Sequence, residues 1–491
     1  MVEYDSRLAE TLAAKMESIR GLGEHDKSIN KLNEAHIAKA FSSAITKSDF
    51  RLGSNWFMWF NGRKYVLLDE MQLRGALYDA LTILDVGVVY VVNSLSKIID
   101  NGLSSLARKP YSPNKSLISF RNGVLNLDTM EMTSPANESL ETPTYIDFDY
   151  DPNSQCPKFR TFLSEVLPDA ATQRVLQEFC GALFVDRKKY VIDKILYLLG
   201  EGQNGKGVFL ECVQHVVGKD NFSSYSMYDL CTSPRRDNNI AGASGKIVNI
   251  CTDMSRADVS GGEFKKFVSG EPMVGKLLFK DTFTVTDIPL AMAALNDIPK
   301  TTDHSFGHIR RHLVIPFDKR IEEDQRDPQL ANKLKQESTG ILNWMFQGRA
   351  RFLANGAKFS SSGVIEVTAR KIKNDQDVIL SFMASKQYLT HKKANTDRLD
   401  VSNEDLYQEY AEYCKKNGHF PQSSNSFTQN LSRKAEYGVE SIRMTDGRRG
   451  KVLYKPVSGY IYDEEMDEVV DIYGLQKRKI EEEKIEEDLP F

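Results

Sequence analysis

Short apolar runs that alternate with helical patterns dominate the middle of the chain. Residues 195–199 (ILYLL), 247–251 (IVNIC), 289–295 (PLAMAAL) and 312–317 (HLVIPF) each have the length and composition of a strand that is buried on both faces. Between the first two runs, apolar residues recur at helical spacing over 209–216. Buried strands that alternate with helices predict an α/β fold built on a parallel sheet.

The N-terminal part has a different pattern, with aromatic strands around tight turns. Residues 56–68 (WFMWFNGRKYVLL) predict a hairpin, because an Asn-Gly pair between two strand-like runs is a strong turn signal. The aromatic residues beside Arg63 and Lys64 are able to stack nucleic-acid bases, but an aromatic hairpin more often forms core, and we favour core. Residues 120–127 (FRNGVLNL) predict a second hairpin-like turn.

The C-terminal part predicts a small helical unit with a basic hairpin. Residues 385–462 contain two helical patterns and then two strand-like runs around a basic turn, which together suggest a winged helix. From 386 to 462 there are 13 Lys/Arg and 9 Asp/Glu, an excess that permits DNA binding through Arg448, Arg449 and Lys451. Winged helices also dock proteins, so protein binding is the alternative.

These patterns divide the chain into four parts. Loop-like composition at 133–144 (TSPANESLETPT) provides the first boundary. The expected parts are an N-terminal mixed α/β domain (1–145), a central α/β domain with its preceding helical segment (146–380), a winged-helix-like domain (385–462) and an acidic, disordered tail (463–491).

Composition is that of an ordinary soluble protein. The chain has 41% hydrophobic and 27% charged residues. It shows neither a signal peptide nor an apolar run near the roughly 18 residues of a membrane span. We therefore expect a cytoplasmic protein that does not bind membranes. The six cysteines and eight histidines have no metal-ligand spacing, which predicts reduced, mostly buried thiols and no zinc site.

Charge is distributed unevenly along the chain. The whole chain carries −4, whereas residues 463–491 contain 12 acidic and 4 basic residues, a net charge of −8. Subtracting −8 from −4 leaves +4 on the other 462 residues. A mildly basic body with an acidic tail is compatible with a polyanionic partner.

The apolar run at 195–199 leads directly into a phosphate-binding motif. Residues 200–206 (GEGQNGK) fit G-x-x-x-x-G-K, and a helical pattern follows them. Glycines let backbone N–H groups turn toward a phosphate, the helix N-terminus adds partial positive charge, and Lys206 reaches the outer phosphates. The alternative is a glycine-rich turn without a ligand, which the strand–loop–helix order disfavours. The expected ATP-contacting residues are Gly200, Gly202, Asn204, Gly205, Lys206, Gly207 and Val208.

Polar residues at two strand ends complete the expected ATP site. Gly207 stands where the motif usually has Ser or Thr, so no hydroxyl is available there for Mg²⁺. Asp253 follows the run at 247–251, where a carboxylate can hold Mg²⁺ directly or through water. Asn296 ends the run at 289–295 and can hold the attacking water or the γ-phosphate.

Two basic clusters lie further along the chain. Residues 270–285 predict a hairpin with Lys280 near its tip, which taken alone is an edge hairpin with solvated charges. Arg310 and Arg311 precede the run at 312–317. Such pairs are often only solvated, but in a ring ATPase they can stabilise transition-state charge on the γ-phosphate of a neighbouring subunit.

The combination of these segments resembles the superfamily 3 AAA+ helicases. The resemblance is carried by GEGQNGKG, KIVNICTD, KKFVSGEPMVGKLLFKD, AALND, FGHIRRHLVIPF and GILNWMFQG. It is greatest with the phage, satellite and poxvirus replicative primase-helicases, and FRNGVLNL and CPKFRTFLSEV are similar to the domain that precedes the helicase core in that group. The match spans about residues 50 to 350, and no primase domain is expected before it.

The resemblance implies a role for each matching residue. It makes Lys206 the phosphate lysine, Asp253 the metal-side acid, Asn296 the sensor, and Arg310 or Arg311 the finger that acts on the next subunit. It also places Lys276 and Lys280 in the hairpin that grips a DNA strand in the channel of a ring. Asp253 has no acidic neighbour in sequence, so no second carboxylate is available beside it as a base.

The expected fold is an AAA+ P-loop ATPase core in the α/β class, with a mixed N-terminal domain and a winged-helix-like C-terminal domain. The expected function is that of an ATP- and Mg²⁺-dependent, ring-forming DNA helicase of a phage or mobile element. It would act as a hexamer on single-stranded and forked DNA in a bacterial cytoplasm. One alternative is an initiator that binds and melts origin DNA through residues 385–462, which is compatible with the same molecule. The other is an ATP-switched scaffold that is not a motor.

The acidic end of the chain suggests a further partner. Residues 485–491 (IEEDLPF) resemble the acidic tip of bacterial single-strand-binding proteins, which docks on replication enzymes. A terminal aromatic ring beside the α-carboxylate suits a pocket rimmed by basic residues. We therefore expect the tip to bind a replication protein, with a chance acidic terminus as the alternative.

Overall fold

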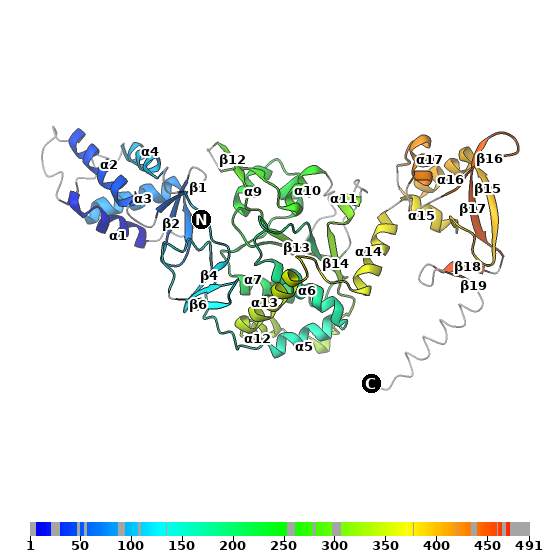
Figure 1. The fold of residues 1–491 in the computed structure, drawn as a ribbon, viewed down its shortest axis with the longest axis horizontal. Coiled ribbons are helices and arrows are strands. Elements are labelled where there is room, and N and C mark those ends of the chain that lie inside the picture. Colours follow the sequence, from blue (N-terminus) through cyan, green and yellow to red (C-terminus); the bar gives the residue numbers. More distant parts are fainter. Residues whose placement is uncertain are drawn as a thin grey trace. The chain divides into compact units, whose positions relative to one another are not determined.

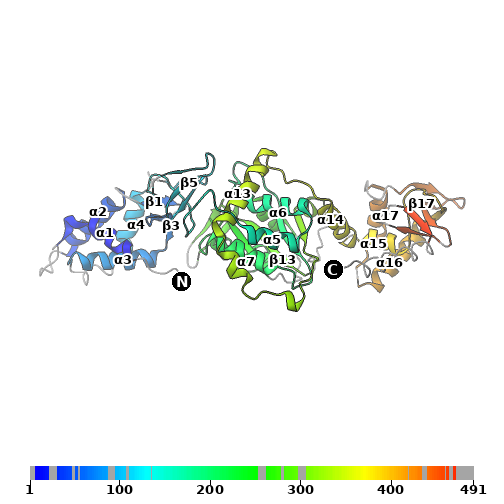
Figure 2. The same ribbon diagram turned by 90° about the horizontal axis from the view of Figure 1, so that it is seen from below.

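A computed structural model of the protein describes residues 6–20, 30–46, 50–53, 56–86, 94–106, 110–133, 135–252, 261–277, 281–296, 306–376, 378–418, 420–433, 439–458, 460–463 and 468–471. The chain divides into two compact units, Met1–Thr368 and Ala369–Phe491. Their helices and strands are drawn in Figure 1 and, from a second direction, in Figure 2. Asp253, Lys280 and the acidic tip at 485–491 lie outside the described residues, so the expectations for them stay predictions.

A five-stranded parallel sheet forms the centre of the first unit. Its strands are β8 (Ile195–Leu199), β9 (Phe222–Ser223), β10 (Val248–Cys251), β13 (Leu290–Leu295) and β14 (His312–Pro316). They lie in the order β14-β8-β13-β10-β9, and every neighbouring pair is parallel. Nearly all side chains of β8, β10 and β13 are buried, because helices cover both faces. The parallel sheet predicted from the apolar runs is confirmed.

Helices cover the two faces of this sheet (Figure 1, Figure 2). One face packs on α5 (Pro157–Val166), α6 (Ala170–Ala182), α7 (Lys206–Val217), α12 (Leu330–Lys335) and α13 (Ser338–Ala354). Further helices of the unit are α8 (Met227–Cys231), α9 (Arg236–Ala243), α10 (Gly262–Ser269), α11 (Phe306–Ile309) and the 3₁₀ turn η5 (Glu323–Gln325). In Figure 1, α9 and α10 lie on the opposite side of β13 and β14 from α6, α7 and α13.

The hairpin expected within 270–285 is present. Strands β11 (Met273–Lys276) and β12 (Thr282–Val285) pair antiparallel, with Lys276 opposite Thr282. The side-chain amide of Asn238 on α9 donates to the Lys276 carbonyl at 2.9 Å, so the hairpin is anchored to this helix at that point.

A small mixed sheet joins the central core at a point where the sequence suggested a boundary. Its strands are β4 (Leu117–Phe120), β5 (Gly123–Asn126), β6 (Glu131–Thr133) and β7 (Thr144–Tyr145), in the order β6-β5-β4-β7. Ile118, Phe120 and Leu125 belong to the same hydrophobic core as the helices that cover the central sheet. The expected boundary at 145/146 therefore cuts across one core. The loop at 133–144 returns the chain to pair β7 with β4 and does not separate two domains.

The first 106 residues have a core of their own. Their elements are α1 (Ser6–Lys15), η1 (Glu17–Ile19), α2 (Asn30–Thr46), β1 (Phe50–Gly53), β2 (Trp56–Phe60), β3 (Tyr65–Leu68), α3 (Glu70–Ile83) and α4 (Leu95–Ser105). Strands β2 and β3 form the hairpin predicted around Asn61-Gly62. Phe57, Trp59 and Phe60 are buried, which confirms that these aromatic residues are core.

The second unit consists of a three-stranded sheet with helices. Its elements are α15 (Val378–Ser385), β15 (Thr396–Ser402), α16 (Asn403–Lys416), α17 (Ser424–Arg433), β16 (Ser441–Arg443), β17 (Arg449–Pro456), β18 (Tyr460–Asp463) and β19 (Glu468–Asp471). Helix α14 (Gly363–Gln376) spans the limit between the units. Sheet order is β15-β17-β16, and Phe382 of α15 packs on Tyr410 and Phe427. Helix α15 thus belongs to this core, whereas the sequence boundaries left most of it outside.

Two expectations from composition concern the chain as a whole. All six cysteines are buried, which confirms the expectation of buried thiols, and the structure pairs none of them in a disulfide. Within the described ranges, no helix has both the length and the apolar character that crossing a membrane requires.

Candidate nucleotide site

The predicted phosphate loop lies between β8 and α7, at the carboxyl edge of the central sheet. This is the edge where the parallel strands end, and the amino edge is where they begin. The Gly200 N–H donates to the Leu295 carbonyl at 3.0 Å, and the Phe317 N–H donates to the Leu199 carbonyl at 2.7 Å. The loop therefore begins between the ends of β13 and β14. Ligands of open α/β sheets bind in the crevice at this edge.

The loop glycines are required for two different reasons. Gly202 and Gly205 have φ of +107° and +87°, a region that favours glycine. A Cβ on Gly200 would meet the Phe317 carbonyl oxygen at 2.4 Å, so this position is closed to any side chain. Around Gly202 and Gly207, a Cβ would meet no atom within 4 Å, which leaves open space over the loop and the first turn of α7. Val208 follows, half-buried, in the same turn.

Lys206 is held inside the loop by protein acceptors. Its ammonium donates to the Gly200 carbonyl at 2.5 Å and to Asn204 Oδ1 at 3.0 Å. The amide of Asn204 in turn donates to the Phe317 carbonyl at 2.7 Å. Burial lowers the pKa of Lys206 below its ordinary value. The lysine and the asparagine are thus fixed to the backbone of β8 and β14, with the charge facing the loop.

The other residues predicted for the ATP site lie around this loop to different extents. Asn296 is exposed and follows Leu295, whose carbonyl accepts the Gly200 N–H, so it lies beside the first loop residue. Thr252 follows β10, the strand on the other side of β13. Asp253 comes next but is not among the described residues. Within the described part, no group of three or more His, Cys, Asp or Glu could hold a metal ion.

The arginine pair lies at the opposite edge of the sheet from the loop. Arg310 and Arg311 precede β14, and the Arg311 carbonyl accepts the N–H of Ile195, the first residue of β8. Strand β8 separates them from the loop by five residues, or about 16 Å at the usual rise of a strand. Arg310 pairs with Asp193 at 2.6 Å, and the Arg311 guanidinium donates to Ser269 Oγ at 2.9 Å. The structure therefore does not bring the arginine pair to the phosphate loop of its own chain.

Two contacts at the loop had no signal in the sequence. Helix α5 supports the loop, since a Cβ on Gly205 would meet Val166 at 2.9 Å and Phe162 at 3.0 Å. The segment after β14 passes over it, because the Ile321 N–H donates to the Gln203 carbonyl at 2.9 Å and the Arg326 guanidinium contacts the Gln203 side chain. Both contacts join residues more than thirty positions apart, beyond the reach of a local pattern.

The residues predicted to contact DNA differ in exposure, and one of them lies outside the described residues. Lys276 is exposed at the end of β11, and Lys280 lies outside the described residues. Arg448 and Arg449 are exposed at the β16–β17 turn, where Arg448 pairs with Asp446 at 2.6 Å. Lys451 requires a correction: it is 2% exposed. Its ammonium donates to Ser441 Oγ at 2.9 Å and also to Ser432, so it is turned inward rather than toward a phosphate.

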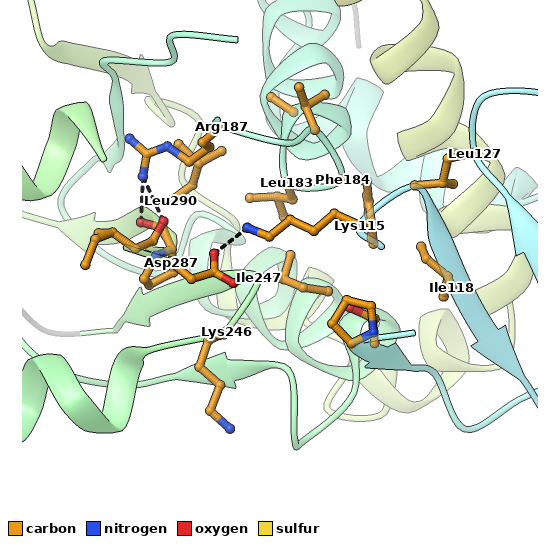
Figure 3. A pocket seen from close by; sticks show the side chains of 17 residues that line it. Lys115, Ile118, Leu127, Leu183, Phe184, Arg187, Lys246, Ile247, Asp287 and Leu290 are labelled. Atoms are coloured by element: carbon orange, nitrogen blue, oxygen red, sulfur yellow. Dashed lines mark hydrogen bonds and ion pairs between the residues drawn. The ribbon is translucent and has the colours of Figure 1, made fainter. Parts of the chain in front are cut away.

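The pocket shown in Figure 3 does not lie at the nucleotide loop. Its volume is about 60 Å³, and its lining includes Gly245–Ile247 and Asp287–Leu290, which lead into β10 and β13. It therefore lies at the amino edge of the sheet. Figure 3 shows Lys115 reaching Asp287 and Arg187 reaching backbone carbonyls. One ion pair and an arginine bound to backbone carbonyls line this pocket, so it suits a structural role.

Known proteins are similar to parts of the chain. Residues 92–168 match the family described as D5 N terminal like, and residues 198–311 match a family of unknown function (DUF5906). The second match includes the phosphate loop, the β11–β12 hairpin and the arginine pair. Among solved structures, two apo structures of the NrS-1 C terminal region, one of them its A form, are similar to this chain at 10% identity. Each comparison covers 85% of this chain and 98% of the other, with TM-scores of 0.48 for the A form and 0.43 for the other.

Proposed function

We propose that this chain is an ATP-dependent, ring-forming replicative DNA helicase of a phage or mobile element that translocates on single-stranded DNA. One observation carries the proposal: the phosphate loop and the arginine pair lie at opposite edges of one sheet. An arginine about 16 Å from its own loop can act on ATP only if a neighbouring subunit presents that ATP. A closed ring of identical chains supplies such a neighbour to every subunit.

The loop fits the phosphates of ATP. Two glycines with positive φ and open space at Gly202 and Gly207 leave room for phosphate oxygens beside backbone N–H groups. The Lys206 ammonium would exchange the Gly200 carbonyl and Asn204 Oδ1 for phosphate oxygens. Asn296, beside the start of the loop, would orient the γ-phosphate or the attacking water. Magnesium bound to ATP would neutralise charge that develops on the transferred phosphoryl group. Asp253 is the residue proposed to hold it.

Two further observations support work on DNA in replication. The match of residues 92–168 to the D5 N terminal like family supports a place among phage-type replication primase-helicases. The β11–β12 hairpin carries Lys276 at its exposed end and, by sequence, Lys280 at its tip. In a ring, such a hairpin would hold DNA phosphates in the channel.

A second function, sequence-specific binding of origin DNA, is favoured by the second unit. Helix α15, strand β15, helices α16 and α17 and the β16–β17 hairpin follow one another as in a winged helix. The exposed face of α17 carries Asn425 and Gln429, which are one helical turn apart. Phe420, which precedes this helix, is 98% exposed. Amide side chains can read adenine in the major groove, while Arg448 and Arg449 would contact phosphates.

The test of the proposed function is Lys206→Met, which keeps the length of the side chain and removes its charge. We expect ATP hydrolysis to fall at least about a hundredfold, since charge placed at the phosphates is worth several kcal/mol in the transition state. Unwinding of a forked duplex should be lost with it. Lys97→Ala, which removes an exposed lysine from α4, is the control and should keep both activities.

Two results would reject parts of the proposal, and a third would extend it. Near-normal turnover of Lys206→Met would reject the loop as the ATP site. ATP hydrolysis without strand displacement by the unaltered protein would favour the scaffold. Protection of a discrete sequence in the element's own DNA, lost on Asn425→Ala/Gln429→Ala, would establish the initiator function as an addition.

A further inference from the structure

A wide basic groove lies at the amino edge of the central sheet, away from the nucleotide loop. Its volume is about 1020 Å³, and it is bordered by the β2–β3 turn, the β4–β5 turn and the end of α7. Six basic residues line it: Arg7, Arg63, Lys64, Arg121, Lys219 and Lys335. Three acidic residues, Asp147, Glu211 and Asp220, line it as well. The lining thus has a net charge of +3, six minus three, with His215 neutral.

Part of this positive charge is available to a ligand. Each acidic residue of the lining pairs with a basic one: Glu211 with Lys335, Asp147 with Arg121 at 3.0 Å, and Asp220 with Lys64 at 3.9 Å. Arg63 and Lys219 are exposed and form no ion pair with any residue that the structure describes. Concave walls of one sign concentrate the field and attract the opposite charge. The groove therefore favours a polyanion.

A flat cationic platform forms one wall of the groove. The Arg63 guanidinium lies 4.8 Å from the centre of the Tyr145 ring. The Tyr145 hydroxyl donates to Asp147, at 2.8 Å, and Asp147 accepts from Arg121. Tyr145 is thus fixed between two arginines. A guanidinium plane backed by an aromatic ring is a surface on which a nucleic-acid base can stack.

A buried asparagine connects the elements that border the groove. Asn221, which is buried, donates to the carbonyls of Tyr145 and Val217, both at 2.7 Å, and accepts from Lys64 at 3.3 Å. These bonds tie the end of α7 to β7 and to the β2–β3 turn. Lys64, one of the cations in the lining, is therefore already in place when a ligand binds, which reduces the entropy lost on binding at this point.

We propose that this groove binds single-stranded nucleic acid, with Arg63 and Lys219 on the phosphates and the Arg63–Tyr145 platform under a base. The proposal rests on the proposed function and adds a second contact for the strand, outside the hairpin. A groove with stacking surfaces suits an unpaired strand, whose bases are exposed. Duplex DNA is read mainly by elements that protrude into its grooves. An acidic peptide would use the charge but not the platform.

The test compares two double variants that lose the same charge. Arg63→Ala/Lys219→Ala removes two groove cations, and Arg74→Ala/Lys97→Ala removes two exposed cations from α3 and α4. Binding of a fluorescent oligo-dT is measured by anisotropy over a range of salt, in the full chain without nucleotide. We expect the groove variant to bind about tenfold more weakly and its log–log salt slope to flatten by about 1.4, which corresponds to two lost phosphate contacts. The control should match the unaltered protein, and neither variant should change DNA-independent ATP hydrolysis.

A second measurement locates the strand. An oligonucleotide with 5-iododeoxyuridine is crosslinked by light, and we expect the crosslinked peptide to contain Tyr145. Equal binding by groove and control variants, or crosslinks confined to other peptides, would overturn the proposal. So would competition by polyglutamate as effective as that by unlabelled oligo-dT, because it would show an acidic-peptide site. Failure of the proposed function is a separate result: the unaltered protein would then hydrolyse no ATP, whatever the groove binds.

Discussion

The two edges of the central sheet are built in opposite ways. At the carboxyl edge, the phosphate loop follows β8, and glycines at 202 and 207 leave open space beside Lys206. At the amino edge around Arg187, apart from the open groove at the end of α7, long side chains fill the space between segments that are far apart in sequence. Ligand chemistry requires space and aligned donors, whereas joining segments requires filled, satisfied contacts. This difference explains why the carboxyl edge has a recognisable motif in the sequence, G-x-x-x-x-G-K, whereas the contacts of Arg187 at the amino edge have none.

Arg187 is the centre of the amino edge. Its guanidinium donates to the carbonyls of Ile192, Ile288 and Pro289 at 2.8, 3.1 and 3.0 Å, and to that of Val268. These carbonyls precede β8 and β13 or belong to the end of α10. Burial lowers the pKa of Arg187 to about 10, so the group stays charged at neutral pH. One side chain thus satisfies four backbone acceptors from three segments.

The prediction with the largest expected effect concerns whether the arginine pair of one chain acts on ATP that is bound at the phosphate loop of the next chain. Arg310→Ala/Arg311→Ala should lower ATP hydrolysis by about a thousandfold, as loss of an arginine finger does. Mixed with Lys206→Met chains under subunit exchange, it should regain part of the activity, since some interfaces then pair an intact loop with intact arginines. The matched control is Arg160→Ala/Arg174→Ala, two exposed arginines on α5 and α6. Absence of recovery in exchanged mixtures would argue that the pair only supports β14.

Arg187→Leu is expected to have the next largest effect, on stability. Four carbonyls would lose their donor, and each unsatisfied buried acceptor costs about 1 kcal/mol or more, so the first unit should lose roughly 3 to 5 kcal/mol. Urea unfolding measures this loss. Arg160→Leu, an exposed arginine, should stay within about 0.5 kcal/mol of the unaltered chain. A small loss at Arg187 would mean that water replaces the guanidinium and that this edge is less tightly closed than described.

The carboxyl edge was predictable because its information is local. Four apolar runs give four of the five strands, the two-residue strand β9 having no such run, and G-x-x-x-x-G-K marks the loop within seven residues. The order β14-β8-β13-β10-β9 was not predictable, because it depends on which strands pair across the sheet. In sequence, Arg187 belongs to the charged segment DRKKY (186–190), which looks like a solvated turn. Its acceptors at Ile288 and Pro289 lie about a hundred residues away, and no local pattern links them.

The same limit explains two wrong expectations. Lys451 belongs to a basic run on a predicted turn, where a phosphate contact is the natural interpretation. In the sheet, the alternation of β17 turns it inward, where it meets Ser432 and Ser441. Residues 117–126 look like part of an N-terminal domain. Their apolar side chains pack on the helices around the central sheet, as in the contact of Tyr150 with Phe120 and Phe346.

A smaller effect concerns acid stability at the amino edge. His312 begins β14, and burial, with His308 and Lys194 nearby, lowers its pKa to about 3. Native His312 is therefore neutral, while the unfolded chain takes up a proton below about pH 6.5. The contribution of neutral His312 to the free energy of unfolding is fully present above pH 6.5. It is lost as pH falls toward 3, by up to about 1.4 kcal/mol per pH unit. His312→Phe should keep the ring packing on Tyr197 and Phe264 and reduce this slope of unfolding free energy against pH. An unchanged slope would mean that other groups cause the acid sensitivity. The control is His391→Gln, which replaces an exposed histidine of the second unit.

The smallest effect concerns the Lys115–Asp287 pair shown in Figure 3. Lys115 precedes β4, and Asp287 precedes β13, so the pair links the small sheet to the amino edge of the central one. The side chains are 23% and 27% exposed, and partly exposed pairs contribute little because solvent screens them. A double-mutant cycle with Lys115→Met and Asp287→Asn should give a coupling of about 1 kcal/mol.

A cycle on the exposed pair Arg121–Asp147, with Arg121→Met and Asp147→Asn, should give less, since both side chains are more than half exposed. If the two cycles give equal energies, Lys115–Asp287 is only a surface pair, and Arg187 alone joins the segments at this edge. A coupling several times larger would mean that solvent screens the pair less than its partial exposure suggests.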